Sequence, residues 1–198
     1  LRQRVGADVE HVSISVGHLG GLIETWVTHD ADYGVPISFL YEDQPLGTAG
    51  ALRNVQDPGG TFLAMNGDIL TTLPFADLVR EHEQAGSIAT VAIKERTVGV
   101  EYGVVHTDDA GAIVRLEEKP SLAFTVSMGI YAFDPRIIDL IEPGERVDFP
   151  DLLLRAIGRG ETVGTYRFDG YWRDIGNRDD YETAVADFAE DAGRFLAR

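Results

Sequence analysis

The chain has 198 residues, of which 17 are lysine or arginine and 33 are aspartate or glutamate, so its formal net charge is −16. This length fits one domain with a substantial core. A surface this acidic repels nucleic acid and anionic membranes, which argues against both as partners. The chain has no cysteine, which excludes disulfides and thiolate metal sites.

No apolar run reaches the length of about 18 residues that a membrane-spanning helix needs. The first residues also lack the apolar core of a signal peptide. We therefore expect a cytoplasmic protein that does not span a membrane.

Apolar periodicity and turn signals predict strands and helices that follow one another along the chain. Strands are expected over 9–16, 36–41, 61–65, 88–93, 103–107, 113–117, 125–133 and 162–167. Helices are expected over 18–28, 48–55, 74–84, 135–141 and 149–158, and a final helix is capped by Asn177. Strands that alternate with helices favour an α/β domain over 1–198, with helices on both faces of a mostly parallel sheet. The hairpin at 103–117 adds an antiparallel part, so the sheet is mixed.

Two turns rich in glycine follow predicted strands. The first contains Gly47, Thr48 and Gly50, and the second is Asn66-Gly67-Asp68. Glycine lets the backbone approach a ligand closely, and the amides that open a helix favour an anion or a polar ring edge. Asp68 follows a buried strand, and open α/β sheets bind ligands at the carboxyl ends of their strands. Taken alone, these turns fit two ordinary strand-to-helix connections equally well.

The runs at 45–52 and 66–68 resemble the sugar-1-phosphate nucleotidylyltransferases, in particular the guanylyl- and thymidylyltransferases for mannose or glucose 1-phosphate. The segments at 102–105, 117–120 and 170–176 match further family motifs in the same order. The resemblance implies a Rossmann-like nucleotide-diphospho-sugar transferase fold. It also implies that a hexose 1-phosphate and a nucleoside triphosphate, with GTP, dTTP and UTP as candidates, react to give a nucleotide sugar and pyrophosphate.

The resemblance also implies roles for individual residues. Asp68 and Asp174 match the aspartates that hold Mg²⁺, and Lys119 matches a lysine that meets the sugar phosphate, so these three are the expected catalytic residues. The nucleotide-binding residues that it implies are Gln44, Leu46, Gly47, Thr48, Asn66 and Gly67. The sugar-binding residues that it implies are Tyr102, Gly103, Glu118, Ser127 and Gly129. Ser127 stands where the family usually has asparagine, which puts its contact with the sugar in question.

The chemistry of nucleotidyl transfer agrees with these roles. The crowded phosphates need a cation, which Mg²⁺ held by one or two carboxylates provides. Each aspartate, taken singly, also fits a turn-stabilising or capping residue, and Lys119 fits a solvated turn. We predict that Asp68 and Asp174 lie close together, and that the Lys119 amine points into the same cleft with Glu118 and Tyr102 beside it.

One family motif does not occur in this sequence. The family begins with a strand and a Gly-x-Gly-Thr-Arg loop that cradles the triphosphate, and neither is found here. We therefore expect the N-terminal strand of the family to be missing from the sheet, and residues 1–198 not to catalyse the transfer alone.

Two other functions remain open. One is a non-catalytic regulatory subunit that binds a nucleotide sugar on the same fold. The other is a metal-dependent glycosyltransferase, which 66–68 disfavours because it has one carboxylate in place of an Asp-x-Asp pair. The base, the sugar and the formation of a homo-oligomer are likewise left open.

Overall fold

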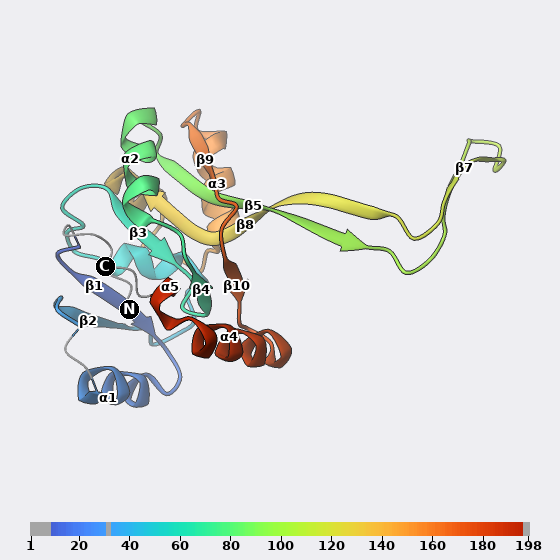
Figure 1. Ribbon diagram of the computed structural model, residues 1–198. Coiled ribbons are helices and arrows are strands. Elements are labelled where there is room, and N and C mark those ends of the chain that lie inside the picture. The colour runs from blue at the N-terminus through green and yellow to red at the C-terminus, as the bar shows by residue number, and fades with distance from the viewer. Residues whose placement is uncertain (1–8, 31–32, 196–198) are drawn as a thin grey trace.

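The computed structural model describes residues 9–30 and 33–195, and its centre is a four-stranded sheet in the order β3-β8-β5-β9 (Figure 1). The strands are β3 (Phe62–Met65), β5 (Ala89–Gly99), β8 (Ser121–Phe133) and β9 (Val163–Arg167). Strand β8 runs antiparallel to β3 and β5, and β5 runs parallel to β9. Strands β3, β5 and β9 therefore share one direction, and the predicted mixed, mostly parallel sheet is confirmed.

Two further strand pairs flank this sheet. Strand β1 (Val12–Val16) pairs in parallel with β2 (Ile37–Tyr41), and α1 (Gly20–Asp30) connects them. Strand β4 (Ile69–Thr71) pairs antiparallel with β10 (Trp172–Asp174). This second pair was not predicted, because strands of three residues are too short for alternation to be read from the sequence.

Helices cover both faces of the central sheet, as predicted. Helix α3 (Phe149–Gly158) packs on the face that carries Tyr131 and Phe133, where the rings of Tyr131 and Phe149 stack with centroids 4.3 Å apart. Helix α2 (Phe75–Ala85) packs on the opposite face. Neighbouring residues of β8 point to opposite faces, so one strand supplies both hydrophobic clusters.

The C-terminal helices follow β10. Helix α4 (Arg178–Glu190) begins at the predicted cap, where the Asp180 N–H donates to the Asn177 side-chain oxygen at 3.0 Å. Helix α5 (Ala192–Phe195) follows directly. None of the helices in the described part of the chain has the length and hydropathy to cross a membrane.

Two predicted helices are short 3-10 turns. The helix expected over 48–55 is η1 (Gly50–Asn54), and the one expected over 135–141 is η2 (Pro135–Leu140). In η1 the cause is tertiary, because the N–H groups of Ala49 and Gly50 both donate to the Val147 carbonyl, at 3.0 and 3.2 Å. Sequence periodicity carries no information about such a bond.

A long β arm leaves the body of the molecule. Strand β5 continues beyond its predicted end at residue 93, and β8 starts four residues earlier than expected. Their outer parts pair with each other, and the hairpin of β6 (Val104–Thr107) and β7 (Ile113–Glu117) lies at the tip (Figure 1). Most side chains of β6 and β7 are exposed, because no second layer covers the arm.

Candidate functional site

Asp68 and Asp174 lie side by side at the pairing of β4 with β10. Asp174 stands opposite Ile69, and the Ile175 N–H donates to the Asp68 carbonyl at 2.8 Å. Asp174 Oδ1 and Asp68 Oδ2 lie 3.1 and 3.2 Å from the point where a Cβ on Gly176 would stand. Both carboxylates therefore face the same small space, and their predicted proximity is confirmed.

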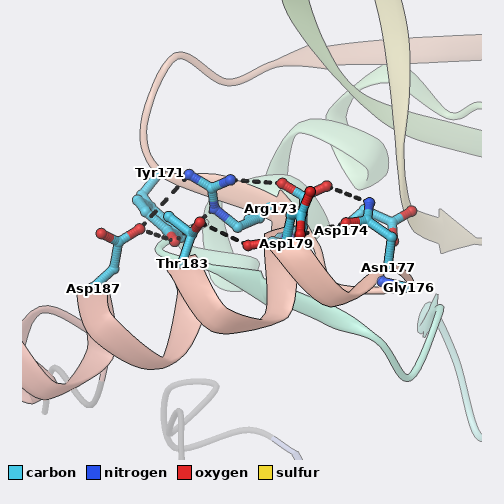
Figure 2. A network of polar contacts seen from close by, with 9 residues as sticks. Tyr171, Arg173, Asp174, Gly176, Asn177, Asp179, Thr183 and Asp187 are labelled. Carbon is cyan, nitrogen blue, oxygen red and sulfur yellow. Dashed lines mark hydrogen bonds and ion pairs between the residues drawn. The ribbon is translucent and has the colours of Figure 1, made fainter.

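Hydrogen bonds fix the segment that carries Asp174 (Figure 2). The Gly176 N–H donates to Asp174 Oδ1 at 2.9 Å, which orients the carboxylate. On the neighbouring residue, the Arg173 guanidinium pairs with Asp180 at 2.7 Å and with Asp187 at 3.8 Å, both on α4. The ion pairs of Arg173 thus anchor β10 to α4, and Asp174 at the end of β10 has a defined orientation.

The carboxylate of Asp180 is compensated within this network. Its Oδ2 accepts a hydrogen bond from the Asn177 amide at 2.6 Å, and its Oδ1 accepts the one from Arg173. The hydrogen bond from Asn177 and that from Arg173 lower the pKa of Asp180. Asp180 is therefore ionised at neutral pH and is matched by a cation of the same domain.

A cavity of about 440 Å³ opens beside Asp174. Its walls combine apolar and polar side chains, which suits a sugar or a base ring. They include Thr48, Asn66, Ser127, Gly129, Asp148, Phe149, Trp172 and Asp174. Residues predicted from four separate parts of the chain (Thr48, Asn66, the pair Ser127 and Gly129, and Asp174) thus meet at one cavity.

The wall at Gly129 depends on a bulge in β8. Between Ser127 and Tyr131 this strand has more residues than the facing part of β5, and the extra residues shift the register. Gly129 has φ +69°, and a Cβ there would stand 2.8 Å from the Asn66 side-chain nitrogen. The Ser127 hydroxyl accepts the Gly129 N–H at 3.2 Å. Ser127 therefore stabilises the bulge through this hydrogen bond.

The turn at Gly47 and Thr48 packs closely against 145–148. The space that its glycines leave is filled by the protein itself, since a Cβ on Gly47 would stand 2.6 Å from the Val147 carbonyl oxygen. The Thr48 N–H donates to Asp148 Oδ1 at 2.8 Å, so this amide is not free for a ligand. Glycine is needed here for contact with 145–148, and binding of nucleotide by this turn stays a prediction.

The other predicted nucleotide contacts lie around this turn. The Leu46 carbonyl accepts the Val147 N–H at 2.9 Å, and Gln44 is exposed. Neither of them, nor Gly67, lines the 440 Å³ cavity. Their roles stay predictions.

Four predicted residues lie on the arm. Glu118 approaches Gly103, with Oε2 3.2 Å from the point where a Cβ on Gly103 would stand, but Tyr102 is 78% exposed. The arm that carries β7 leaves the body of the molecule (Figure 1), and Lys119 lies between β7 and β8 in the chain. The predicted placement of the Lys119 amine in one cleft with Asp68 is therefore not seen. The sequence missed this because the extension of β5 and β8 into an arm leaves no local signal, and the roles predicted for these four residues stay predictions.

Trp172 and Asp148 are among the cavity-lining residues that were not predicted as site residues. Trp172 donates from its indole N–H to the Met128 carbonyl at 2.9 Å, which fixes the ring as a wall. Asp148 accepts from Thr48, a residue 100 positions earlier. Trp172 lay within the 170–176 motif and was visible there, whereas no spacing rule connects Asp148 with Thr48.

The residues present fit a divalent cation. No group of three or more His, Asp or Glu residues that could hold a metal occurs in the described ranges. Two carboxylates facing one space are nevertheless a suitable set for Mg²⁺, which is usually held by one or two carboxylates together with substrate phosphates and water. The donor set therefore suits a metal that arrives with a phosphate ligand.

A family model described as nucleotidyl transferase matches residues 2–191. The chain belongs to the nucleotidyl transferase family. It is 33% identical to a UTP–glucose-1-phosphate uridylyltransferase of Synechocystis sp., over 89% of this chain and 50% of that protein. It is 32% identical to a mannose-1-phosphate guanyltransferase of Yarrowia lipolytica, over 81% of this chain and 46% of that protein. The resemblance to sugar-1-phosphate nucleotidylyltransferases is confirmed.

Solved structures support the fold of this nucleotidyl transferase domain. HddC from Yersinia pseudotuberculosis superposes with a TM-score of 0.68 at 22% identity, over 91% of this chain and 80% of that chain. At this identity the likeness concerns the fold alone. The chain spans about half the length of the curated relatives that it matches.

Proposed function

We propose that this domain belongs to an enzyme that transfers a nucleotidyl group from a nucleoside triphosphate to a hexose 1-phosphate of the mannose or glucose type. The observation that carries the proposal is the pair of carboxylates, Asp68 and Asp174, at the edge of a cavity of sugar size. Two relatives named for a uridylyl and a guanylyl transfer to a sugar 1-phosphate support it.

The reaction defines what the site has to provide. A phosphate oxygen of the sugar 1-phosphate forms a bond to the α-phosphorus, and the bond from that phosphorus to the oxygen bridging to the β-phosphate breaks. The electron pair of the broken bond leaves with pyrophosphate. The reacting groups are all anionic, and the chain itself carries a net charge of −16, so the phosphates require a cation.

Asp68 and Asp174 would hold Mg²⁺, which when bound neutralises the phosphates and withdraws charge from the reacting phosphorus. The chain's own residues keep the carboxylates in place for this purpose. The Gly176 N–H fixes Asp174, and the bond from the Ile175 N–H to the Asp68 carbonyl ties the two segments together. Preorganised carboxylates reduce the cost of assembling the site at the moment of reaction.

The cavity would hold the uncharged part of a substrate. The Asn66 side chain and the Thr48 and Ser127 hydroxyls provide polar atoms along its wall, while Trp172 provides a flat apolar surface. Such a combination orients a sugar ring or a base and excludes water from one side of it.

The test is a pyrophosphate-release assay on the full-length protein. GTP, dTTP and UTP would each be combined with mannose 1-phosphate and with glucose 1-phosphate, with Mg²⁺ or with EDTA. We expect turnover for one preferred pair, and loss of turnover with EDTA. Tight binding of a nucleotide sugar without any turnover would overturn the proposal in favour of the regulatory subunit.

A further inference from the structure

A second cavity, of about 430 Å³, adjoins the first at Trp172 and Asp174. Trp172 and Asp174 line both cavities, so the two share one wall. The second cavity also includes Arg96, Gly176 and Asn177. Asp174 therefore faces a cavity without any cation on one side and a cavity with an arginine on the other.

Arg96 lies on β5 where this strand leaves the body of the molecule. Its guanidinium carbon is 5.7 Å from the centroid of the Trp172 ring, a cation–π contact. The Trp172 ring is itself fixed by its bond to the Met128 carbonyl. No described residue accepts a hydrogen bond from the Arg96 guanidinium, so its N–H groups are available as donors.

The other cations near this wall already have partners. Lys94 donates to the Gly170 carbonyl at 2.7 Å, and Arg173 pairs with Asp180 and Asp187. Among the described residues, no carboxylate lies within ion-pair distance (4.0 Å) of Arg96. In the described part of the chain, Arg96 is thus the one cation on the walls of these two cavities, and its charge contributes to the lowered pKa of Asp180 without forming an ion pair with it.

Two carboxylates share the second cavity with Arg96, and each has another partner or role. Asp180 is neutralised by Arg173 and accepts from Asn177. Asp174 faces Asp68 and suits a divalent cation, which would offset its charge toward a phosphate. With Asp180 paired to Arg173 and Asp174 offset by a bound divalent cation, Arg96 would be available to an anion, in a protein whose overall charge repels anions.

We infer that Arg96 binds a phosphate group of a substrate in the second cavity. The guanidinium has a planar fork of donors that matches phosphate oxygens in pairs. A ligand that spans the shared wall would keep its uncharged ring in the first cavity, and its phosphate between Arg96 and the Asp68–Asp174 pair. The inference rests on the proposed function for the identity of that ligand, a sugar 1-phosphate or a nucleoside triphosphate.

The test is calorimetric titration of the full-length protein in the presence of Mg²⁺, with each probe titrated alone. The probes are mannose 1-phosphate and glucose 1-phosphate, the two unphosphorylated sugars, and GTP, dTTP and UTP. We expect Arg96→Gln to weaken binding of a phosphorylated probe about tenfold or more, and to leave binding of the neutral sugars unchanged. Arg96→Lys should lose less, because it keeps the charge without the fork.

The matched control is Arg80→Gln, which removes the same charge from α2 at a position that lines neither cavity. It should bind every probe like the wild type. A loss for sugar phosphates alone, or for triphosphates alone, supports the inference and identifies which substrate provides the phosphate. Equal binding of all probes by wild type and Arg96→Gln overturns it.

The pyrophosphate-release assay separates this inference from the proposed function. If Arg96→Gln weakens phosphate binding but the wild type never releases pyrophosphate, the phosphate site is supported and the proposed activity is refuted. If the wild type is active and Arg96→Gln has an unchanged KM for both substrates, the proposed activity is supported and the phosphate site is refuted.

Discussion

Thr48 is hydrogen-bonded to Asp148, 100 residues later in the sequence, and to the neighbouring Phe149, and these two bonds form a bracket. The Thr48 N–H donates to Asp148 Oδ1 at 2.8 Å, and the Thr48 hydroxyl accepts the Phe149 N–H at 2.9 Å. Asp148 occupies the cap position of α3 but makes no capping bond to that helix, because its carboxylate is used by Thr48. The bracket thus joins the Gly47 turn to the start of α3 at the wall of the first cavity.

Asp148→Ala is expected to loosen this turn. Removing the acceptor leaves the Thr48 N–H without its charged partner and should cost about 1–2 kcal/mol in the free energy of unfolding. Asp148→Asn keeps an oxygen at the same position and should retain most of the stability. Urea denaturation of both variants measures this, and equal losses in the two would show that the charge, and not the hydrogen bond, is what matters.

Gly47→Ala tests the close approach of the turn to 145–148. Gly47 has φ +76°, and a Cβ there would stand 2.6 Å from the Val147 carbonyl oxygen. Gly59 is a matched control, with φ +75° and open space around it. Both alanine variants should lose about 1 kcal/mol from the left-handed backbone. Gly47→Ala should lose about 1–3 kcal/mol more from the clash, and an equal loss in the two would contradict the packing described here.

The ion pair of Glu145 with Arg155 predicts a loss of stability in acid. The hydrogen bonds from Arg155 lower the pKa of Glu145 from its ordinary 4.5 to about 2. Since the folded protein holds this proton less tightly than the unfolded chain, the stabilisation is complete above pH 4.5 and is lost as the pH falls towards about 2. Glu145→Gln should therefore flatten this part of the stability curve.

The control for this measurement is Glu190→Gln at the end of α4, which removes the same charge far from Arg155. Chemical denaturation at a series of pH values compares the three proteins. A Glu145→Gln variant that loses stability between pH 4.5 and 2 as steeply as the wild type would show that this ion pair does not cause the loss of stability in acid.

Much of the fold was readable from the sequence because apolar periodicity is a local signal. It located α3, α2 and the strands on either side, and the capping role of Asn177. It failed where tertiary contacts decide: the Val147 carbonyl takes the amides that would have opened a helix at 48–55. The length of the arm was missed for a similar reason, since outer β5 and outer β8 stabilise each other only as a pair.

The candidate site divides along the same line. Asp68 and Asp174 were found because each ends a recognisable motif, and the structure brings them together through the pairing of β4 with β10, which was not predicted. Asp148 and Arg96 were missed because neither belongs to a motif. Their importance depends on what they face in the folded chain.

We propose that Asp68 and Asp174 act together in a nucleotidyl transfer that depends on Mg²⁺. The most direct test is the rate of pyrophosphate release by the full-length protein carrying Asp68→Asn, Asp174→Asn or both, with Asp109→Asn at the turn of the arm as the control. Each single variant should lower kcat by roughly 10²–10³, the size of effect expected when one preorganised charged group is lost. The double variant should be little worse than the poorer single one, because both residues serve one metal. A double variant that turns over at the wild-type rate would show that neither aspartate serves the reaction.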